Sequence, residues 1–268
     1  MQEEFQELKK LIDQYDVVSF DVFDTLLLRN VLKPTDLFWA MESYVLEEYQ
    51  IAGFAEKRIL AEAKSRVGHE NNETTLGDIY TTFANEYPCD KEKLFEKELQ
   101  VETKFLVKNP WMYEIYAYAK KKHKKVLAIS DMYLPKDFIV QVLKDQGYDL
   151  DGVYVSSTNF QVKGNQSLFH FVQKEEDIDL TKWIHIGDNR ISDYESPKSM
   201  GIEAYHYISV GQRSGFQNQS DTLAESIFKA VSQNKIFTSL RDLDEWEVFG
   251  IRYVAPLYYS FTNWIYQL

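Results

Sequence analysis

An apolar strand that ends at a carboxylate is encoded by Val17-Val18-Ser19-Phe20-Asp21-Val22-Phe23-Asp24-Thr25-Leu26. In an open α/β sheet, ligands bind at the carboxyl ends of the strands, so Asp21 stands where chemistry is expected. A carboxylate at such a place can attack a phosphoryl or carbon centre and carry the covalent intermediate, which divides one difficult displacement into two easier ones. Asp21 is therefore the candidate nucleophile.

The composition indicates a globular protein. The chain has 268 residues, 44% of them hydrophobic, which suffices for a core domain with an inserted subdomain. Its net charge of −12 is spread along the chain, which argues against nucleic acid as a partner. The single cysteine, Cys89, cannot form an internal disulfide, so we expect a reducing, cytoplasmic location. No uninterrupted apolar run reaches the roughly 18 to 20 residues of a membrane helix, and no membrane span is predicted.

An all-helical block is predicted after the first strand. Apolar residues recur there at spacings of three and four, the pattern of amphipathic helices, over residues 37–49, 54–67, 76–87 and 91–107. Because this block separates the first strand from the next one, we interpret residues 33–107 as a helical cap inserted over the active-site edge. Residues 1–32 and 108–243 then form the core.

Strands and helices alternate in the second half of the chain. The patterns predict strands at 125–130, 152–156, 183–187 and 202–207, with helices at 136–146, 167–174 and 193–200 between them. Such alternation is typical of a parallel sheet with helical crossovers. We therefore expect an α/β fold, a Rossmann-like parallel sheet with helices on both faces and the helical cap inserted between its first and second motifs.

The C-terminal segment 244–268 is rich in aromatic residues. It either docks on the core or begins a further domain, and the sequence leaves open whether Leu268 is the natural end. The charges and the proline within it make a membrane span improbable.

Polar side chains follow four of the predicted strands. They are, in chain order, Asp21, Ser130, Lys163, and Asp188 with Asp193. This ordered set, with a helical insertion between its first two members, resembles the haloacid dehalogenase-like (HAD) superfamily over roughly residues 16–207. Isolated residues of these types are usually turn formers, solvated charges or helix caps, and Asp193 could simply cap the helix that follows it.

Two of these carboxylates, Asp21 and Asp188, would repel each other at one sheet edge unless a hard divalent cation lay between them. Mg²⁺ is the expected cofactor, and the backbone carbonyl of Phe23 is a further oxygen ligand that the resemblance also implies. We expect Asp193 near the metal, orienting a metal-bound water.

The remaining groups suit a phosphoryl ligand. Ser130 would donate its hydroxyl to a phosphoryl oxygen, and Lys163 would hold Asp21 in place and offset charge in the transition state. We also assign Thr25 and Asp131 to the phosphate site, where Asp131 could act through its backbone amide.

The position two residues after the nucleophile departs from the resemblance. Phosphatases of the superfamily generally carry an aspartate there that protonates the leaving group, whereas this chain has Phe23. Asp24 is one residue further on and would point to the other side of an extended chain. A missing acid/base group costs about 10² to 10⁴ in rate, so a slow enzyme and an inactive module are both open.

Three segments narrow the resemblance: Ser-Phe-Asp-Val-Phe-Asp-Thr-Leu-Leu (19–27), Ser-Asp-Met-Tyr-Leu-Pro (130–135) and His-Ile-Gly-Asp-Asn (185–189). Together they are similar to a bacterial subgroup found with glycosyltransferases of surface-polysaccharide synthesis. The subgroup implies a sugar phosphate or glycan precursor as ligand and a glycosyltransferase domain or partner. The expected activity is Mg²⁺-dependent phosphomonoester hydrolysis. The alternative is an inactive module that binds metal and phospho-ligand and serves as a scaffold or regulator beside a glycosyltransferase.

Two other side chains have plainer interpretations. His185, between two isoleucines, is expected to pack on the sheet rather than act as a base. Tyr133 could stack on a sugar or pack in the core.

Overall fold

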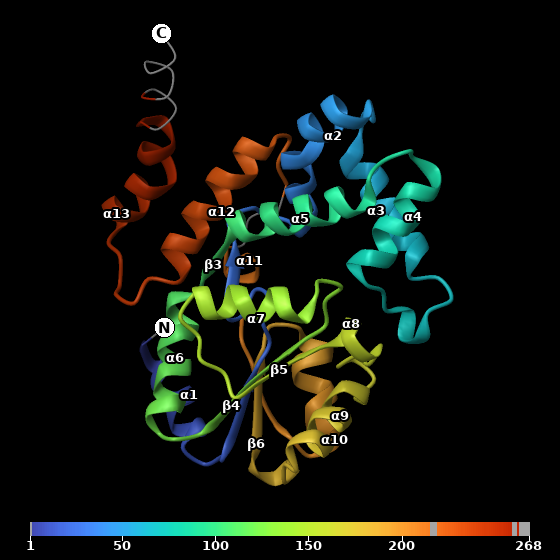
Figure 1. The fold of residues 1–268 in the computed structure, drawn as a ribbon. Coiled ribbons are helices and arrows are strands. Elements are labelled where there is room, and N and C mark those ends of the chain that lie inside the picture. The colour runs from blue at the N-terminus through green and yellow to red at the C-terminus, as the bar shows by residue number, and fades with distance from the viewer. Residues whose placement is uncertain (1, 215–218, 259–261, 263–268) are drawn as a thin grey trace.

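The computed structural model of the protein describes residues 2–214, 219–258 and 262. Its centre is a parallel sheet of five strands in the order β5-β4-β1-β6-β7 (Figure 1). These strands are β1 (Val17–Phe20), β4 (Lys125–Ser130), β5 (Gly152–Val155), β6 (Trp183–Gly187) and β7 (Glu203–His206). The predicted α/β class and parallel sheet are confirmed.

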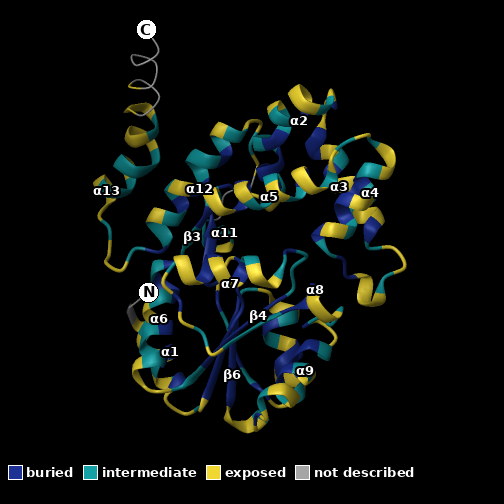
Figure 2. Ribbon diagram, viewed as in Figure 1, coloured by how far each residue is buried: buried dark blue, intermediate teal, exposed yellow. Residues whose placement is uncertain are grey.

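Helices cover both faces of this sheet because successive side chains of each strand point to opposite sides. Val18 and Phe20 belong to the buried cluster that contains α1 (Gln2–Ile12), α6 (Pro110–Lys121) and α7 (Lys136–Asp145). Val17 belongs to a second cluster with α9 (Ser167–Glu176). The central strands are accordingly buried along their length (Figure 2).

A small two-stranded sheet separates the main sheet from the inserted helices. Its strands, β2 (Leu27–Arg29) and β3 (Leu106–Lys108), pair antiparallel. The predicted helix at 91–107 therefore stops at Phe105, because Leu106 and Val107 pair with Arg29 and Leu28. Between the two strands, the chain forms η1 (Pro34–Met41), α2 (Glu42–Tyr49), α3 (Phe54–Ser65), η2 (Glu70–Asn72), α4 (Leu76–Glu86) and α5 (Lys91–Phe105).

The inserted helices have a polar centre of their own. The buried guanidinium of Arg58 on α3 donates to both carboxylate oxygens of Glu98 on α5, at 2.8 and 2.7 Å. The hydroxyl of Tyr80 on α4 donates to the same carboxylate at 2.6 Å. A buried charge is tolerated when it is paired and hydrogen-bonded in this way, so these three residues tie α3, α4 and α5 together.

Several elements were not predicted from the sequence. They include α1, α8 (Ser156–Asn159), η3 (Leu180–Lys182), α11 (Val210–Arg213) and α12 (Leu223–Phe237). The predicted helix at 193–200 begins earlier, with η4 (Arg190–Glu195) followed by α10 (Ser196–Met200). Of these, α12 lies against η1, where Ser226 donates to the buried Asp36 at 2.6 Å.

Part of the aromatic C-terminal segment is described. It forms α13 (Glu245–Phe249) and η5 (Gly250–Val254), and the hydroxyl of Ser232 on α12 donates to the carbonyl of Ile251 at 3.2 Å. Trp246 is 81% exposed. Tyr258 is 66% exposed. The other aromatic residues of the segment, Tyr259, Phe261, Trp264 and Tyr266, lie outside the described residues, as does Leu268.

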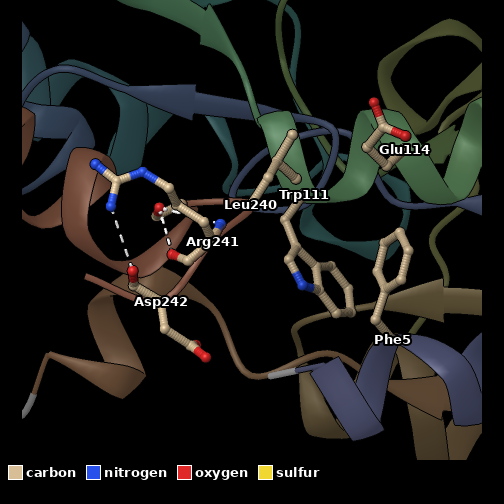
Figure 3. A pocket seen from close by; sticks show the side chains of 7 residues that line it. Phe5, Trp111, Glu114, Leu240, Arg241 and Asp242 are labelled. Carbon is tan, nitrogen blue, oxygen red and sulfur yellow. Dashed lines mark hydrogen bonds between the residues drawn. The ribbon is translucent and has the colours of Figure 1, made fainter. Parts of the chain in front are cut away.

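The link between α12 and α13 passes α1 and α6. There, Leu240, Arg241 and Asp242 border a cavity of about 190 Å³ together with Phe5 and Trp111, whose rings meet edge to face (Figure 3).

Within the described ranges, no helix combines the length and the apolar character needed to cross a membrane.

Candidate active site

The carboxyl ends of the three central strands carry the predicted site residues. Asp21 directly follows β1, Ser130 ends β4, and Asp188 directly follows β6. Because β1 pairs with both β4 and β6, Asp21 lies between the other two positions. The backbone N–H of Asp21 donates to Ile186 at 2.8 Å, so the pairing with β6 continues to the nucleophile position.

Lys163 joins two of the carboxylates. Its Nζ lies 2.5 Å from Oδ1 of Asp21 and 2.5 Å from Oδ1 of Asp193. Burial alone would lower the pKa of Lys163, but the carboxylates of Asp193, Asp21 and Asp131 outweigh it and raise that pKa. The lysine is therefore charged, as a residue that holds Asp21 must be.

Asp131 acts on the backbone of that lysine. The N–H of Lys163 donates to both carboxylate oxygens of Asp131, at 3.0 and 3.1 Å. The carbonyl of Lys163 accepts from Ser196 at 2.5 Å. The Asp131 side chain therefore fixes the loop that carries Lys163.

The carboxylates of Asp21, Asp188 and Asp193 form a compact acidic cluster. One oxygen from each lies within 4.8 Å of the others. Burial, and then the charges of Asp24 and Asp193, raise the pKa of Asp188 to about 7. Burial likewise raises the pKa of Asp21, helped by Asp193 and Asp188 and opposed by Lys163. Such mutual repulsion among oxygen ligands fits a divalent cation that prefers oxygen, as Mg²⁺ does.

Within this cluster, Asp193 already has partners for both oxygens. Oδ1 faces Lys163 and His185, and Oδ2 accepts from the backbone N–H of Asn189 at 3.0 Å. Burial would raise its pKa, but Lys163 and His185 lower it overall. A Cβ placed on Gly187 would lie 2.6 Å from Asp193, so glycine is required at the end of β6 for Asp193 to pack there.

A buried hydrogen-bond chain continues from Asp193 below the sheet edge. Nε2 of His185 lies 3.3 Å from Asp193 Oδ1, and its Nδ1 lies 2.8 Å from the hydroxyl of Ser19. That hydroxyl accepts from the indole N–H of Trp183 at 2.7 Å. His185 is fully buried, as predicted, but its link to Asp193 was missed. Two polar residues, Ser19 and His185, on otherwise apolar neighbouring strands were the available signal.

Phe23, Asp24 and Thr25, which follow the candidate nucleophile, lie in different surroundings. Phe23 is buried and its ring contacts the guanidinium of Arg29. Asp24 adopts a left-handed backbone with φ of 59° and lies close enough to Asp188 to raise its pKa. Thr25 is fully buried, and its hydroxyl has no hydrogen-bond partner within the described residues. An unpaired buried hydroxyl four residues after Asp21 fits a site that receives a ligand oxygen.

The inserted helices rest on the loops that follow β4 and β5. The backbone N–H of Leu76 donates to the carbonyl of Tyr133 at 2.9 Å, and Ser156 donates to the buried Glu73 at 2.6 Å. The ring of Tyr133 lies 5.0 Å from the guanidinium carbon of Arg58. The ring of Tyr133 therefore packs against Arg58, and its stacking on a sugar stays a prediction.

Comparisons with known proteins find relatives by structure. No family model matches the chain, and no curated protein matches it by sequence. A 2-haloacid dehalogenase from Pseudomonas syringae is similar over 77% of this chain and 90% of its own, with a TM-score of 0.55 and 14% identity. A HAD phosphatase from Thermococcus onnurineus is similar over 78% of this chain and 95% of its own, with a TM-score of 0.53 and 19% identity.

A third structure contains a metal. The HAD-hydrolase candidate YfnB from Bacillus subtilis, bound to magnesium, is similar over 78% of this chain and 93% of its own, with a TM-score of 0.52 and 14% identity. At these identities the likeness establishes the fold. The chain therefore has the fold of the HAD-like hydrolases, which is the superfamily that its motifs resemble.

Proposed function

We propose that the protein is a Mg²⁺-dependent phosphohydrolase that cleaves a phosphomonoester through an aspartyl-phosphate on Asp21. The observation that carries this proposal is the placement of Asp21, buried at the end of the central strand and in contact with Lys163. A HAD phosphatase and a magnesium-bound HAD protein among the structural neighbours support it.

Asp21 and Asp188 would hold the metal together with the backbone carbonyl of Phe23. When bound, the ion offsets the charges of the carboxylates and of the phosphate and polarises the phosphoryl oxygens. We assign Asp193 a positioning role beside it, because Lys163, His185 and Asn189 already occupy its oxygens.

The chain's own residues account for the transfer. A carboxylate oxygen of Asp21 forms a bond to phosphorus as the bond to the leaving oxygen breaks, and water then cleaves the acyl phosphate to release inorganic phosphate and regenerate Asp21. Lys163 keeps the Asp21 carboxylate oriented, while the hydroxyls of Ser130 and Thr25 donate to phosphoryl oxygens. Asp24, turned by its left-handed backbone, is the candidate that protonates the leaving oxygen.

The finer parts of the proposal concern substrate and context. The three motif segments favour a sugar phosphate or glycan precursor as substrate, in a cytoplasmic protein that works with a glycosyltransferase domain or partner. We divide the chain into a core of 1–32 and 108–243, a cap of 33–107 and the segment 244–268. The separation of the inserted helices from the main sheet by the two-stranded β2–β3 sheet supports this division.

A second candidate is a module that binds metal and phosphate without turnover and serves as a scaffold or regulator. One observation favours it: an aromatic ring in contact with Arg29 stands at the position where the resemblance implies an acid/base aspartate. Rates reduced by about 10² to 10⁴ through that loss would make the protein hard to distinguish from an inactive one.

Phosphate release from sugar phosphates, nucleotides and an aryl phosphate, with and without Mg²⁺, tests the proposal. We expect metal-dependent release by the wild type, loss in Asp21→Asn, and wild-type release by Asp137→Asn, a matched change at an exposed position on α7. Equal release by wild type and Asp21→Asn would rule out the covalent mechanism. Mg²⁺ and phosphate binding without release from any substrate would favour the module.

A further inference from the structure

A polar cavity of about 330 Å³ lies between the segment that leads into the inserted helices and the two helices after β7. Arg29, Val31 and Leu32 form one wall, and Ser209, Gln212 and Gln233 belong to the other. The volume is near the lower end of the range for small-molecule sites. Asn234 on α12 fixes the two walls together by donating to the carbonyl of Arg29 at 3.0 Å.

This cavity borders the candidate metal site. Asp24 lines it directly. The side-chain amide of Gln212 donates to the carbonyl of Asp188 at 3.4 Å and accepts from the backbone N–H of Ser209 at 3.1 Å. A molecule in the cavity would therefore lie next to both Asp24 and Asp188.

On the side of the site away from this cavity, the inserted segment is hydrogen-bonded to the core. Asn71 donates to the carbonyl of Phe160 at 2.6 Å, in addition to the Glu73–Ser156 bond and the contact between Leu76 and Tyr133. These contacts join the inserted helices to the loops after β4 and β5. Room for a leaving group is thus found toward α11 and α12.

One polar side chain that lines the cavity, Gln233, is largely buried. The residue is 7% exposed, and its amide atoms form no hydrogen bond to the described residues but keep access to solvent. A ligand that offers hydroxyl groups can replace this solvent and satisfy both the N–H donors and the oxygen of the amide.

The lining suits one class of ligand. Amide and hydroxyl groups from Gln212, Gln233 and Ser209 can exchange hydrogen bonds with hydroxyls, while Val31 and Leu32 offer an apolar wall to C–H groups. We propose that this cavity holds the leaving group of the substrate and that this group is polyhydroxylated, as in a sugar monophosphate. The inference rests on the proposed phosphate site at Asp21 and extends it.

Binding measurements test it without requiring turnover. Calorimetric titration in Mg²⁺ compares inorganic phosphate with a panel of hexose and pentose monophosphates. Every protein in the comparison carries Asp21→Asn, which prevents turnover, and this parent protein is compared with the same protein carrying Gln233→Leu or Gln100→Leu. Gln100 is exposed on α5 and supplies the matched control. We expect at least one sugar phosphate to bind the parent protein more tightly than phosphate, and Gln233→Leu to weaken that binding about tenfold. Binding of inorganic phosphate should stay unchanged in all three proteins, which also reports that the variants are folded.

A second variant isolates the cavity. Gln233 also borders an apolar groove between α12 and η5, whereas Ala230 lines the cavity and does not border that groove. Ala230→Leu should therefore exclude the sugar phosphate while phosphate still binds.

The outcomes separate this inference from the proposed function. Sugar phosphates that bind no more tightly than phosphate, or that bind both cavity variants as well as the parent protein, would overturn the cavity assignment. Hydrolysis would then still be judged from phosphate release by the wild type and Asp21→Asn. Sugar-phosphate binding that depends on Gln233 and Ala230, together with no phosphate release by the wild type, would support the cavity and contradict the hydrolase.

Discussion

The ring of Phe23 lies against the guanidinium group of Arg29, with Cζ 4.3 Å from the ring centroid. Arg29 is buried and also pairs with Glu102 of α5, at 3.4 Å between Nε and Oε2. Phe23, two residues after the candidate nucleophile Asp21, is thus part of a contact that joins the sheet edge to the inserted helices. A carboxylate placed at position 23 would lie near that cation.

Phe23→Asp should raise phosphate release, but by less than the factor of about 10² to 10⁴ that a well-placed general acid contributes. Arg29 would favour the ionised form of the new carboxylate and lower its pKa, so little of the acid form would be present at neutral pH. The gain over wild type should therefore increase as the pH falls. Rates measured across a pH series check this.

Phe23→Asn is the matched control, because asparagine has nearly the same shape as aspartate but no acidic proton. Both variants lose the buried ring and should be destabilised by similar amounts, about 3–5 kcal/mol. Equal rates for the two variants at every pH would show that proton donation from position 23 is irrelevant.

The pair of Arg58 and Glu98 should dominate the stability of the inserted helices. Glu98→Gln removes the carboxylate that accepts two hydrogen bonds from the buried guanidinium and leaves Glu62, at 3.2 Å, as its remaining carboxylate partner. We therefore expect the free energy of unfolding to fall by up to about 3–5 kcal/mol. Tyr80→Phe removes one hydrogen bond to that carboxylate and should cost about 1–3 kcal/mol. Urea denaturation measures both losses.

Glu96→Gln is the corresponding change at an exposed position of the same helix and should stay within about 0.5 kcal/mol of the wild type. A loss for Glu98→Gln no larger than that of this control would mean that the buried pair contributes nothing to the fold.

The sequence predicted what depends on local pattern. The strands at 125–130 and 183–187 were predicted with the bounds that the structure gives them, because apolar runs between turn signals are local. The position of Asp21 at a strand end followed from the same pattern. The three-residue strand β3 was missed, because so short a pairing leaves little periodicity and the helical spacing of α5 runs into it.

Roles that depend on distant partners could not be predicted. The side chain of Asp131 holds the backbone of Lys163, which is 32 residues away, and no local pattern indicates this contact. The expected contact of the Asp131 backbone amide with the phosphate stays a prediction. His185 reaches Ser19 across 166 residues, and the pairing became visible only once β1 and β6 lay side by side. No sequence motif surrounds Gln233, and its role as a ligand-binding residue is inferred from its burial in the cavity beside the site.

Neutral His185 should make the fold sensitive to acid. Burial lowers its pKa from the ordinary value, although Asp193 opposes the shift. A base whose pKa is lowered on folding contributes stability above its unfolded pKa of about 6.5, and that stability is lost as the pH falls through the folded value. His185→Gln should therefore flatten the decline of the melting temperature below about pH 6.5.

His123→Gln removes an exposed histidine and should leave the decline as it is in the wild type. The same acid sensitivity in His185→Gln as in the wild type would assign the decline to other groups.

Binding of Mg²⁺ should weaken as the pH falls below about 7. In the metal-free protein, burial and the charges of Asp24 and Asp193 raise the pKa of Asp188 to about 7, so a proton competes with the ion for this carboxylate. Each pH unit below that value should reduce the apparent affinity by up to about tenfold. The raised pKa of Asp188 also affects the stability of the metal-free protein. Protonation of Asp188 stabilises the folded state below the unfolded pKa of about 3.9, and this stabilisation is lost as the pH rises toward 7. Added Mg²⁺ should then raise the melting temperature more at pH 8 than at about pH 6.

Asp24→Asn distinguishes protonation of Asp188 from unfolding of the protein in acid as the cause of weaker Mg²⁺ binding. Without the neighbouring charge, the pKa of Asp188 should be lower, and the fall in Mg²⁺ affinity should move to lower pH. Asp188→Asn should bind the ion weakly at every pH, while the exposed Asp137→Asn should follow the wild type. Calorimetric titrations from about pH 6 to about pH 8 distinguish these curves. An affinity that stays constant over that range in the wild type would mean that no carboxylate titrating near 7 takes part in binding the ion, and Asp188 would then have to be removed from the proposed metal site.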